Sequence, residues 1–390
     1  MAVSDCPQPR RNKRPPVASL LVAAAGILVS AARAGHELPV YPSYYPHEIA
    51  IETMAPERAA DLLRQNKLHA YLAPRSPFSE DPPAQIRTVE SLGSFILVRL
   101  NPASAAVRDA SSACATIARV IGGMAQSGGF VFHPYPVTPF HGDYLYFADL
   151  ADAAKARFTA ASAAAGPHPK IRADGAERNL LPAEWIAPGA EWDAAVEAID
   201  AADLLDASMT SVNGWSGPPW LKAGWFHAQR MLGDALDDPD AKGRADDLLA
   251  RLEASEERDA VERINLERDL VTTLTGNCRQ VVAGYTVKRQ VFNAEFTEGI
   301  ENIGFDAIGG LNSPMFLRTV KLKDFPWNGW LSLGIDSGAG AAWNPIAGFS
   351  DPFGRALWSA VGDPALLPQP YDAGWMLNRI SDVQSRPLPP

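Results

Sequence analysis

The sequence predicts an α/β protein, in the broad sense that includes α+β folds, built on a mixed sheet. We expect a βαββαβ N-terminal region, an acidic helical insertion and a C-terminal β-rich region that returns to the core. Three observations predict this: strand and helix patterns alternate between residues 48 and 132, acidic helical segments fill 183–274, and extended patterns resume after Gly276. The expected divisions are a signal peptide at 1–34, an α/β domain at 35–166, a helical subdomain at 167–275 and a β-rich region at 276–390 that packs on the first domain.

The N-terminal region alternates between the two structural periods. Residues 48–53 alternate polar and apolar side chains, as a half-buried strand does, whereas Pro56 precedes a helically spaced apolar face in 57–66. Further strands are expected at 68–72, 94–100 and 130–132, and a long helix at 103–126. This order predicts a split βαβ sheet with helices on one face, whose first and last strands share one sheet. It also fits one lobe of a larger α/β binding protein.

The remaining segments follow from the same periodicities. We expect helices at 149–165, 192–205, 219–236 and 353–361, one or two helices within 246–274, and extended segments at 281–292 and 315–323. Asn328-Gly329, between two tryptophans, is typical of a two-residue hairpin turn because both turn positions need positive φ.

The first 34 residues have the pattern of a secretory signal peptide. A basic stretch at 10–14 precedes the apolar run Val17–Ala32, and Ala32-Arg33-Ala34 is a small-x-small cleavage site. A membrane anchor is the alternative, but the run is shorter than the roughly 20 apolar residues that cross a bilayer. We therefore expect export to the periplasm, cleavage near Ala34 and no membrane span in the rest of the chain.

Composition narrows the partners and the compartment. The net charge of −10 repels phosphate backbones, so we expect no nucleic-acid partner. Of the three cysteines, Cys6 leaves with the leader. An oxidising compartment then favours a disulfide between Cys114 and Cys278, with two buried free thiols as the alternative.

Two proline-rich tracts, 36–48 and 133–144, carry four of the seven histidines. Each places a Pro-Val-x-Pro core between its histidines, which keeps the backbone extended. Because the tracts flank the first and last strands of the predicted sheet, their side chains are expected to converge on a divalent metal, copper or zinc, which imidazole and carboxylate ligands suit. The candidate ligands are His36, His47, Glu48, His133, His141 and Asp143. The spacing matches no named metal motif, and ordinary surface histidines are the alternative.

Aromatic residues beside glycine and proline are candidate walls of a ligand site. They are Tyr44, Tyr45, Tyr144, Trp215 and Trp220, for which packing in the core is the alternative. The sequence contains no complete hydrolase, metalloprotease or P-loop signature, and neither cysteine has a histidine beside it to support a thiol nucleophile. These features favour a protein that binds over one that catalyses.

Three segments carry a resemblance to a known family. Leu38–Tyr44 is similar to an opening strand and ligand loop, and Ala59–Leu63 with Asn66–Pro74 is similar to a helix and a strand that ends at a cleft. In these segments the chain resembles the first lobe of periplasmic solute-binding proteins, especially the phosphonate-type group. The resemblance implies two lobes that close on a small ligand and deliver it to an ABC transporter. The block 183–274 has no counterpart in that family.

The leading hypothesis is an exported, non-catalytic protein that binds a small solute or a metal ion in an uptake or cofactor-handling system. One alternative is a periplasmic metal-dependent enzyme that uses the histidine and carboxylate cluster, which would need an open coordination position and a general base at a cleft. Another is a structural partner of a periplasmic dehydrogenase or transporter, with tryptophans at the interface.

Overall fold

The computed structural model describes residues 46, 48–105, 107, 109–125, 127–161, 168–208, 210–212, 215–217, 220–295, 297–324, 329–338, 340, 351–361, 366–370, 374–378 and 381. All of them belong to one compact unit, Tyr41–Pro390. The predicted leader and its cleavage site lie outside the described residues. Within the described ranges, no helix combines the length and the apolar character that a membrane span requires.

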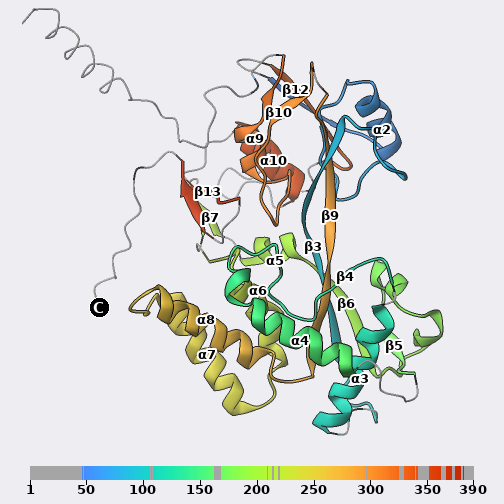
Figure 1. Ribbon diagram of the computed structural model, residues 1–390, viewed down its shortest axis with the longest axis vertical. Helices are drawn as coiled ribbons and strands as arrows, with labels where there is room; N and C mark the ends of the chain where they lie inside the picture. The colour runs from blue at the N-terminus through green and yellow to red at the C-terminus, as the bar shows by residue number, and fades with distance from the viewer. Residues whose placement is uncertain are drawn as a thin grey trace, which may run out of the picture. The chain divides into compact units, whose positions relative to one another are not determined.

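The described helices and strands follow one another along most of the chain (Figure 1). The helices are α2 (Pro56–Arg64), α3 (Ala110–Met124), α4 (Ala148–Ala161), α5 (Ala201–Ser208), α6 (Gly224–Leu232), α7 (Pro239–Ala254), α8 (Ala260–Leu274), α9 (Pro314–Thr319) and α10 (Pro352–Val361). The strands are β1 (Glu48–Thr53), β2 (Ala70–Tyr71), β3 (Ile86–Leu100), β4 (Val131–Phe132), β5 (Ile171–Arg172), β6 (Ala194–Asp200), β7 (Thr210–Val212), β8 (Trp215–Gly217), β9 (Gln280–Asn293), β10 (Ile300–Asn302), β11 (Lys321–Leu322), β12 (Trp330–Ile335), β13 (Leu366–Pro368) and β14 (Trp375–Leu377).

A mixed eight-stranded sheet confirms the predicted fold class. Its order is β1-β12-β2-β9-β3-β6-β5, with β4 also paired to β9. The pairs β1–β12, β12–β2 and β5–β6 are parallel, whereas β9 runs antiparallel to β2, β3 and β4. The C-terminal region therefore returns to the core, as predicted, because β9 and β12 lie inside the sheet.

The antiparallel ladder of β3 and β9 connects the two halves of this sheet (Figure 1). At its β1 end, Ile86–Glu90 pair with Arg289–Asn293, and at its β6 end, Phe95–Arg99 pair with Gln280–Tyr285. The register shifts twice along the ladder, once between Leu92 and Phe95, beside Gly93 in β3, and once within the β6 end between Ile96 and Leu97, beside Ala283 in β9. Such bulges bend a strand and increase its twist. One bend therefore lies between the two ends and the other within the β6 end.

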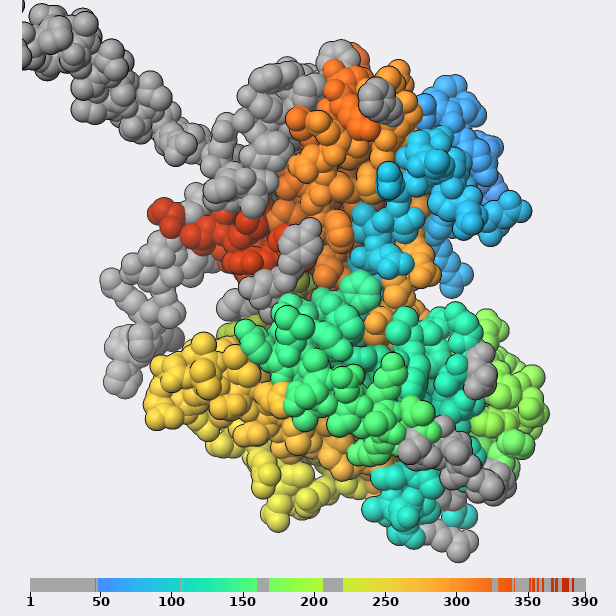
Figure 2. All heavy atoms as spheres, in the orientation of Figure 1, coloured from blue at the N-terminus to red at the C-terminus, as the bar shows by residue number. Residues whose placement is uncertain are grey.

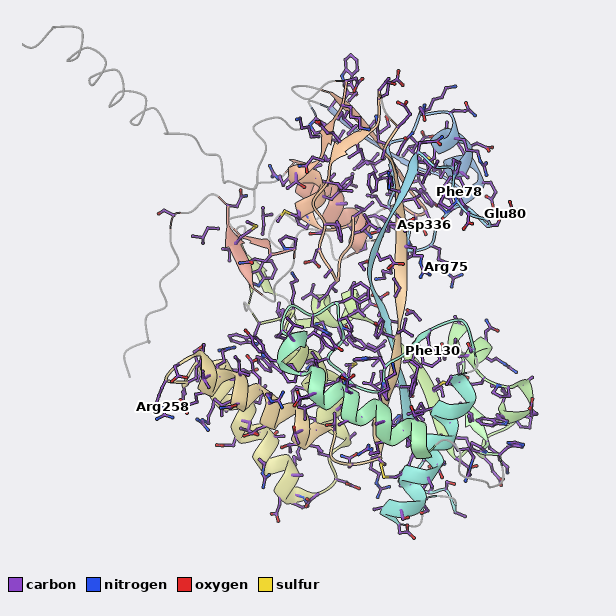
Figure 3. All side chains as sticks on the ribbon, in the orientation of Figure 1. Arg75, Phe78, Glu80, Phe130, Arg258 and Asp336 are labelled. Carbon is purple, nitrogen blue, oxygen red and sulfur yellow. A yellow bond between two sulfur atoms is a disulfide. The ribbon has the colours of Figure 1, made fainter. Side chains whose placement is uncertain are left out.

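Glycine permits two close approaches within the ladder, at Gly93 and at Gly284. A Cβ on Gly93 would lie 2.8 Å from the carbonyl oxygen of Thr286, and one on Gly284 would lie 2.9 Å from the ring of Phe130, which Figure 3 labels beside β4. Both distances are shorter than real Cβ contacts, so a larger residue at either position would push the strands apart.

Separate apolar cores cover the two ends of the ladder. At the β6 end, Phe95 and Leu97 face a core formed with α6, α7 and α8, whereas Ile96 and Val98 face a second core formed with α3. At the β1 end, one core includes residues of β12 and α9, and another includes residues of α2. Burial on both faces explains why the middle of β3 is a continuous apolar run instead of an alternating one.

The disulfide between Cys114 and Cys278 is present, as predicted. Cys114 lies in α3 and Cys278 just before β9, with 5.0 Å between their Cα atoms. The bond ties α3 to the β6 end of the ladder.

The predicted strand order is wrong. Split βαβ topology requires β1 to β4 to form one sheet among themselves, but β12 lies between β1 and β2, and β9 lies between β2 and β3. The inserted strands come from more than 200 positions later in the chain, as the pairing of Tyr71 with Val291 shows. Local periodicity carries no information about such long-range pairing.

Two element predictions are also wrong. Within 192–205, residues 194–200 form strand β6, because pairing with Ser94–Leu100 overrides the helical propensity of its alanines. The segment 315–323 is predicted to be extended, but its first five residues, 315–319, belong to helix α9, which has Ser313 as a cap and Pro314 in the first turn. The predicted hairpin turn at Asn328 lies outside the described residues.

Candidate functional site

The structure describes only some of the predicted site residues. His36, Tyr44, Tyr45 and His47 lie outside the described residues. Glu48 is exposed at the start of β1, and Trp215 begins β8. Among the described residues, no group of three or more His, Cys, Asp or Glu side chains is arranged to hold a metal ion. The metal site therefore stays a prediction.

His141 contacts a histidine that the sequence analysis did not single out. The backbone N–H of Thr138 donates to His141 Nδ1 over 2.9 Å, so this nitrogen is an acceptor. His141 Nε2 lies 3.0 Å from His227 Nδ1, and His227 Nε2 lies 2.9 Å from the carbonyl oxygen of Leu221. Only one placement of the ring protons satisfies all three hydrogen bonds: His141 Nε2–H donates to His227, and His227 Nε2–H donates to Leu221.

This arrangement keeps both imidazoles neutral. To become charged, either imidazole would have to accept a second proton at its Nδ1, and that nitrogen already accepts a hydrogen bond. Burial in the core is the main cause that holds the pKa of His141 well below 6.5 and lowers the pKa of His227 to about 4. Phe95 stacks on His141 with ring centroids 6.1 Å apart and meets His227 edge-on at 5.9 Å. The pair is therefore a buried structural unit at the middle of the ladder.

His133 makes its own contacts. Its Nε2 lies 2.8 Å from the carbonyl oxygen of Val137, and its ring meets Tyr144 and Tyr285. Burial lowers the pKa of His133 as well. Tyr144, a predicted ligand wall, is half-buried against this ring.

Asp143 positions the start of α6. Its Oδ2 accepts from the backbone N–H of Gly224 over 2.9 Å, where a carboxylate also interacts favourably with the helix dipole. Burial, and after it the charge of Asp143, raises the pKa of Glu267 to about 7. Arg263 Nε donates to Glu267 over 3.0 Å and partly offsets this effect.

A buried ion pair joins segments from the two ends of the ladder. Lys222 Nζ contacts Asp306 Oδ2 and donates to the carbonyl oxygen of Gln369, and both charged side chains are only 3% exposed. The other oxygen of Asp306 accepts from the N–H groups of Ile308 (2.9 Å) and Gly309 (2.8 Å). Lys222 belongs to the core at the β6 end, whereas Asp306 precedes α9 in a turn held against β3.

Three tryptophans belong to or pack against the core that contains Leu221, Ala223 and Ile308, which are close in sequence to this ion pair. The indole N–H groups of Trp220, Trp225 and Trp375 are buried and have no acceptor in the described part of the chain. Trp220 and Trp225 lie 6.4 Å apart between ring centroids, and Trp375 pairs with Pro368, next to Gln369. We call Trp220, Lys222, Trp225, Asp306 and Trp375 the junction cluster. It combines buried donors, a cation and an anion where segments from both ends of the ladder meet.

The comparisons with known proteins give only distant similarity. No family model and no curated protein matches the sequence. Among solved structures, the chain aligns with NikA from Brucella suis in complex with Fe(III)-EDTA at 13% identity, covering 65% of this chain and 58% of NikA, with a TM-score of 0.36. For HbpA2 from Haemophilus parasuis the identity is 13%, the coverage 69% and 56%, and the TM-score 0.40. For OppA from Haemophilus influenzae in complex with RPPGFSPFR the identity is 10%, the alignment covers 69% of this chain and 56% of OppA, and the TM-score is 0.36. The alignments thus span less than two thirds of each of these solved chains, so we argue function from this chain's own residues.

Only one member of the junction cluster, Trp220, is among the residues predicted from the sequence. Lys222 lies between Trp220 and Trp225 in sequence, and a lysine within an apolar aromatic segment is a signal that was available. Asp306 and Trp375 carry no comparable local signal, because only the chain fold brings them to Lys222.

Proposed function

We propose that this protein is an exported solute-binding protein that holds a small, oxygen-rich solute at the junction cluster. The observation that carries the proposal is the set of buried indole N–H groups of Trp220, Trp225 and Trp375, which lack acceptors among the described residues beside a buried Lys–Asp pair. Each unsatisfied buried donor costs roughly 1–3 kcal/mol, so such groups need an explanation. A solute that supplies acceptor oxygens recovers this free energy.

The fold supports a closing motion around such a solute. Segments from both ends of the ladder supply the cluster, and the ladder that joins these ends contains two bulges. Small changes of twist at the bulges would change the separation between Lys222 and Asp306. Indole donors accept any oxygen-bearing group, so the proposal names an oxygen-rich solute and not specifically a phosphonate.

Export and delivery belong to the same proposal. The basic and apolar leader supports removal of residues 1–34 and a periplasmic location. The Cys114–Cys278 disulfide supports an oxidising compartment. A periplasmic binding protein of this kind would deliver its solute to a membrane transporter of the ABC type.

The test compares two tryptophans. Protein purified from the periplasm is examined by native mass spectrometry for a bound solute, and is then titrated with acetate, phosphate, glutamate and glucose while its tryptophan emission is followed. We expect at least one bound species, and an affinity about fivefold weaker in Trp225→Phe, because that change removes one hydrogen bond and keeps an aromatic ring.

Trp185→Phe is the matched control, since Trp185 is also buried but packs in the core around α3. This variant should bind as the wild type does. Equal weakening in both variants, or no bound species in either measurement, would contradict the proposal.

A further inference from the structure

A recess separate from the junction cluster lies between α4, the end of α8 and the start of β9. Its volume is about 200 Å³. Green α4 and the yellow-to-orange α7 and α8 adjoin on the face shown in Figure 2. Arg268 of α8 pairs with Asp149 of α4 over 2.7 Å. Most of the lining is apolar, including Pro134, Pro136, Leu150 and Phe158. None of the junction cluster residues lines it.

The ring of Tyr135 is part of the apolar wall of the recess. Tyr135 lines it and is only 3% exposed, and its hydroxyl is buried and makes no hydrogen bond within the described structure. Burial raises the pKa of this phenol above its usual value, so the group stays neutral. This wall suits the apolar part of a ligand.

The guanidinium of Arg157 provides a positive charge at the open side of the recess. Arg157 lines it and is exposed, and its guanidinium carbon lies 4.6 Å from the ring centroid of Phe158, another lining residue. No carboxylate in the described ranges pairs with Arg157, although many other arginines there form ion pairs. A guanidinium held against an aromatic ring is well suited to bind a carboxylate through two parallel hydrogen bonds.

The size of the recess limits the ligand. An apolar protein cavity of about 150 Å³ holds benzene. The volume of the recess exceeds that of such a cavity, and the additional space is enough for a small polar group. A compact apolar body with one carboxylate therefore matches its volume, walls and charge.

We infer that this recess is a binding site for a compact apolar monocarboxylate of about the size of a single aromatic ring. The carboxylate meets Arg157 at the open side, and the apolar body fills the space beside Phe158 and the ring of Tyr135. This site is independent of the solute proposed for the junction cluster, and either can exist without the other.

The experiment uses benzoate as the probe, in calorimetric titrations of the full mature chain, with benzyl alcohol as the uncharged comparison. We expect one benzoate per chain, bound at least tenfold more tightly than benzyl alcohol. Arg157→Gln should weaken benzoate binding about tenfold or more, because it removes a charge-assisted contact. Lys155→Gln, a charge change on the same helix at a residue that does not line the recess, should leave binding unchanged.

Two further variants separate binding from folding. Tyr135→Phe should leave both benzoate binding and the free energy of unfolding unchanged, since it removes a buried hydroxyl that has no partner and does not face the recess. Ala154→Phe should fill the recess and abolish binding. The inference is overturned if no saturable benzoate binding is seen, if benzyl alcohol binds equally well, or if Arg157→Gln and Lys155→Gln behave alike. Binding that survives Ala154→Phe in folded protein would also overturn it.

Discussion

Removing one charge of the buried ion pair is the most direct test of how the ends of the ladder are joined. In Lys222→Met the aliphatic volume is kept and the ammonium is lost. The carboxylate of Asp306 then stays buried with only the N–H groups of Ile308 and Gly309 as known partners. An uncompensated buried charge of this kind costs about 3–5 kcal/mol.

The double variant sharpens the expectation. Asp306→Asn keeps an oxygen for the two backbone donors and removes the negative charge. When it is combined with Lys222→Met, no charge stays buried, so the double variant should lose less stability than the sum of the two single variants. A coupling free energy of about 2 kcal/mol is expected, measured by urea unfolding at pH 7.

An exposed ion pair provides the reference. Arg58 and Glu52 lie 2.7 Å apart with side chains 60% and 56% exposed, so Arg58→Met should cost less than about 1 kcal/mol. The reasoning is refuted if Lys222→Met costs no more than Arg58→Met. It is equally refuted if the two single changes at the buried pair add without coupling.

Three further outcomes are expected. Glu267→Gln mimics the protonated acid. Because the folded-state pKa of Glu267, about 7, lies above the ordinary 4.5, the stability of the wild type falls as pH rises from 4.5 to 7. By urea unfolding, the variant should therefore be up to about 3 kcal/mol more stable than the wild type at pH 8 but not at pH 4.5. Gly93→Ala should lower the unfolding free energy by about 1–3 kcal/mol, because its Cβ would crowd Thr286 at the bulge. Replacing Cys114 and Cys278 by alanine should cost at most about 5 kcal/mol, seen as a lower thermal midpoint.

Each of these has an internal control. Gly128→Ala places its Cβ where no atom lies within 4 Å, so it should change stability by less than about 0.5 kcal/mol, and an equal effect of both alanine changes would contradict the steric argument. A stability difference between Glu267→Gln and wild type that does not vary with pH would show that the carboxyl does not titrate as described. Mature protein without Cys6 that reacts with a thiol reagent before reduction would exclude the disulfide.

Local sequence signals predicted many of the elements well. The alternation in 48–53, the helix opened by Pro56 and the apolar segment 281–292 correspond to β1, α2 and β9. In these cases the period of the buried residues is also the period of the element. Prediction failed at β6 and α9, where sheet pairing and a Ser-Pro helix start, respectively, outweighed the apparent pattern.

The candidate site was harder to predict. Trp220 was identified because its glycine and proline neighbours mark a turn, and His141 because of its proline-rich tract. The partner of His141 is His227, 86 positions later, and the partner of Lys222 is Asp306, 84 positions later. Neither pairing has a signature in a single sequence, because many arrangements of the chain satisfy the same local preferences.

The sequence by itself determined the α/β class, most of the helices and the long strands, and the one disulfide that the cysteines of the predicted mature chain allow. These depend on side-chain periodicity and on residue chemistry, which act over a few neighbours. Only the tertiary structure decided that β9 and β12 enter the sheet between N-terminal strands, that Lys222 pairs with Asp306, and that three tryptophans from distant segments share one core. Such contacts arise from burying surfaces of distant segments together, and that free energy is a property of the folded chain as a whole.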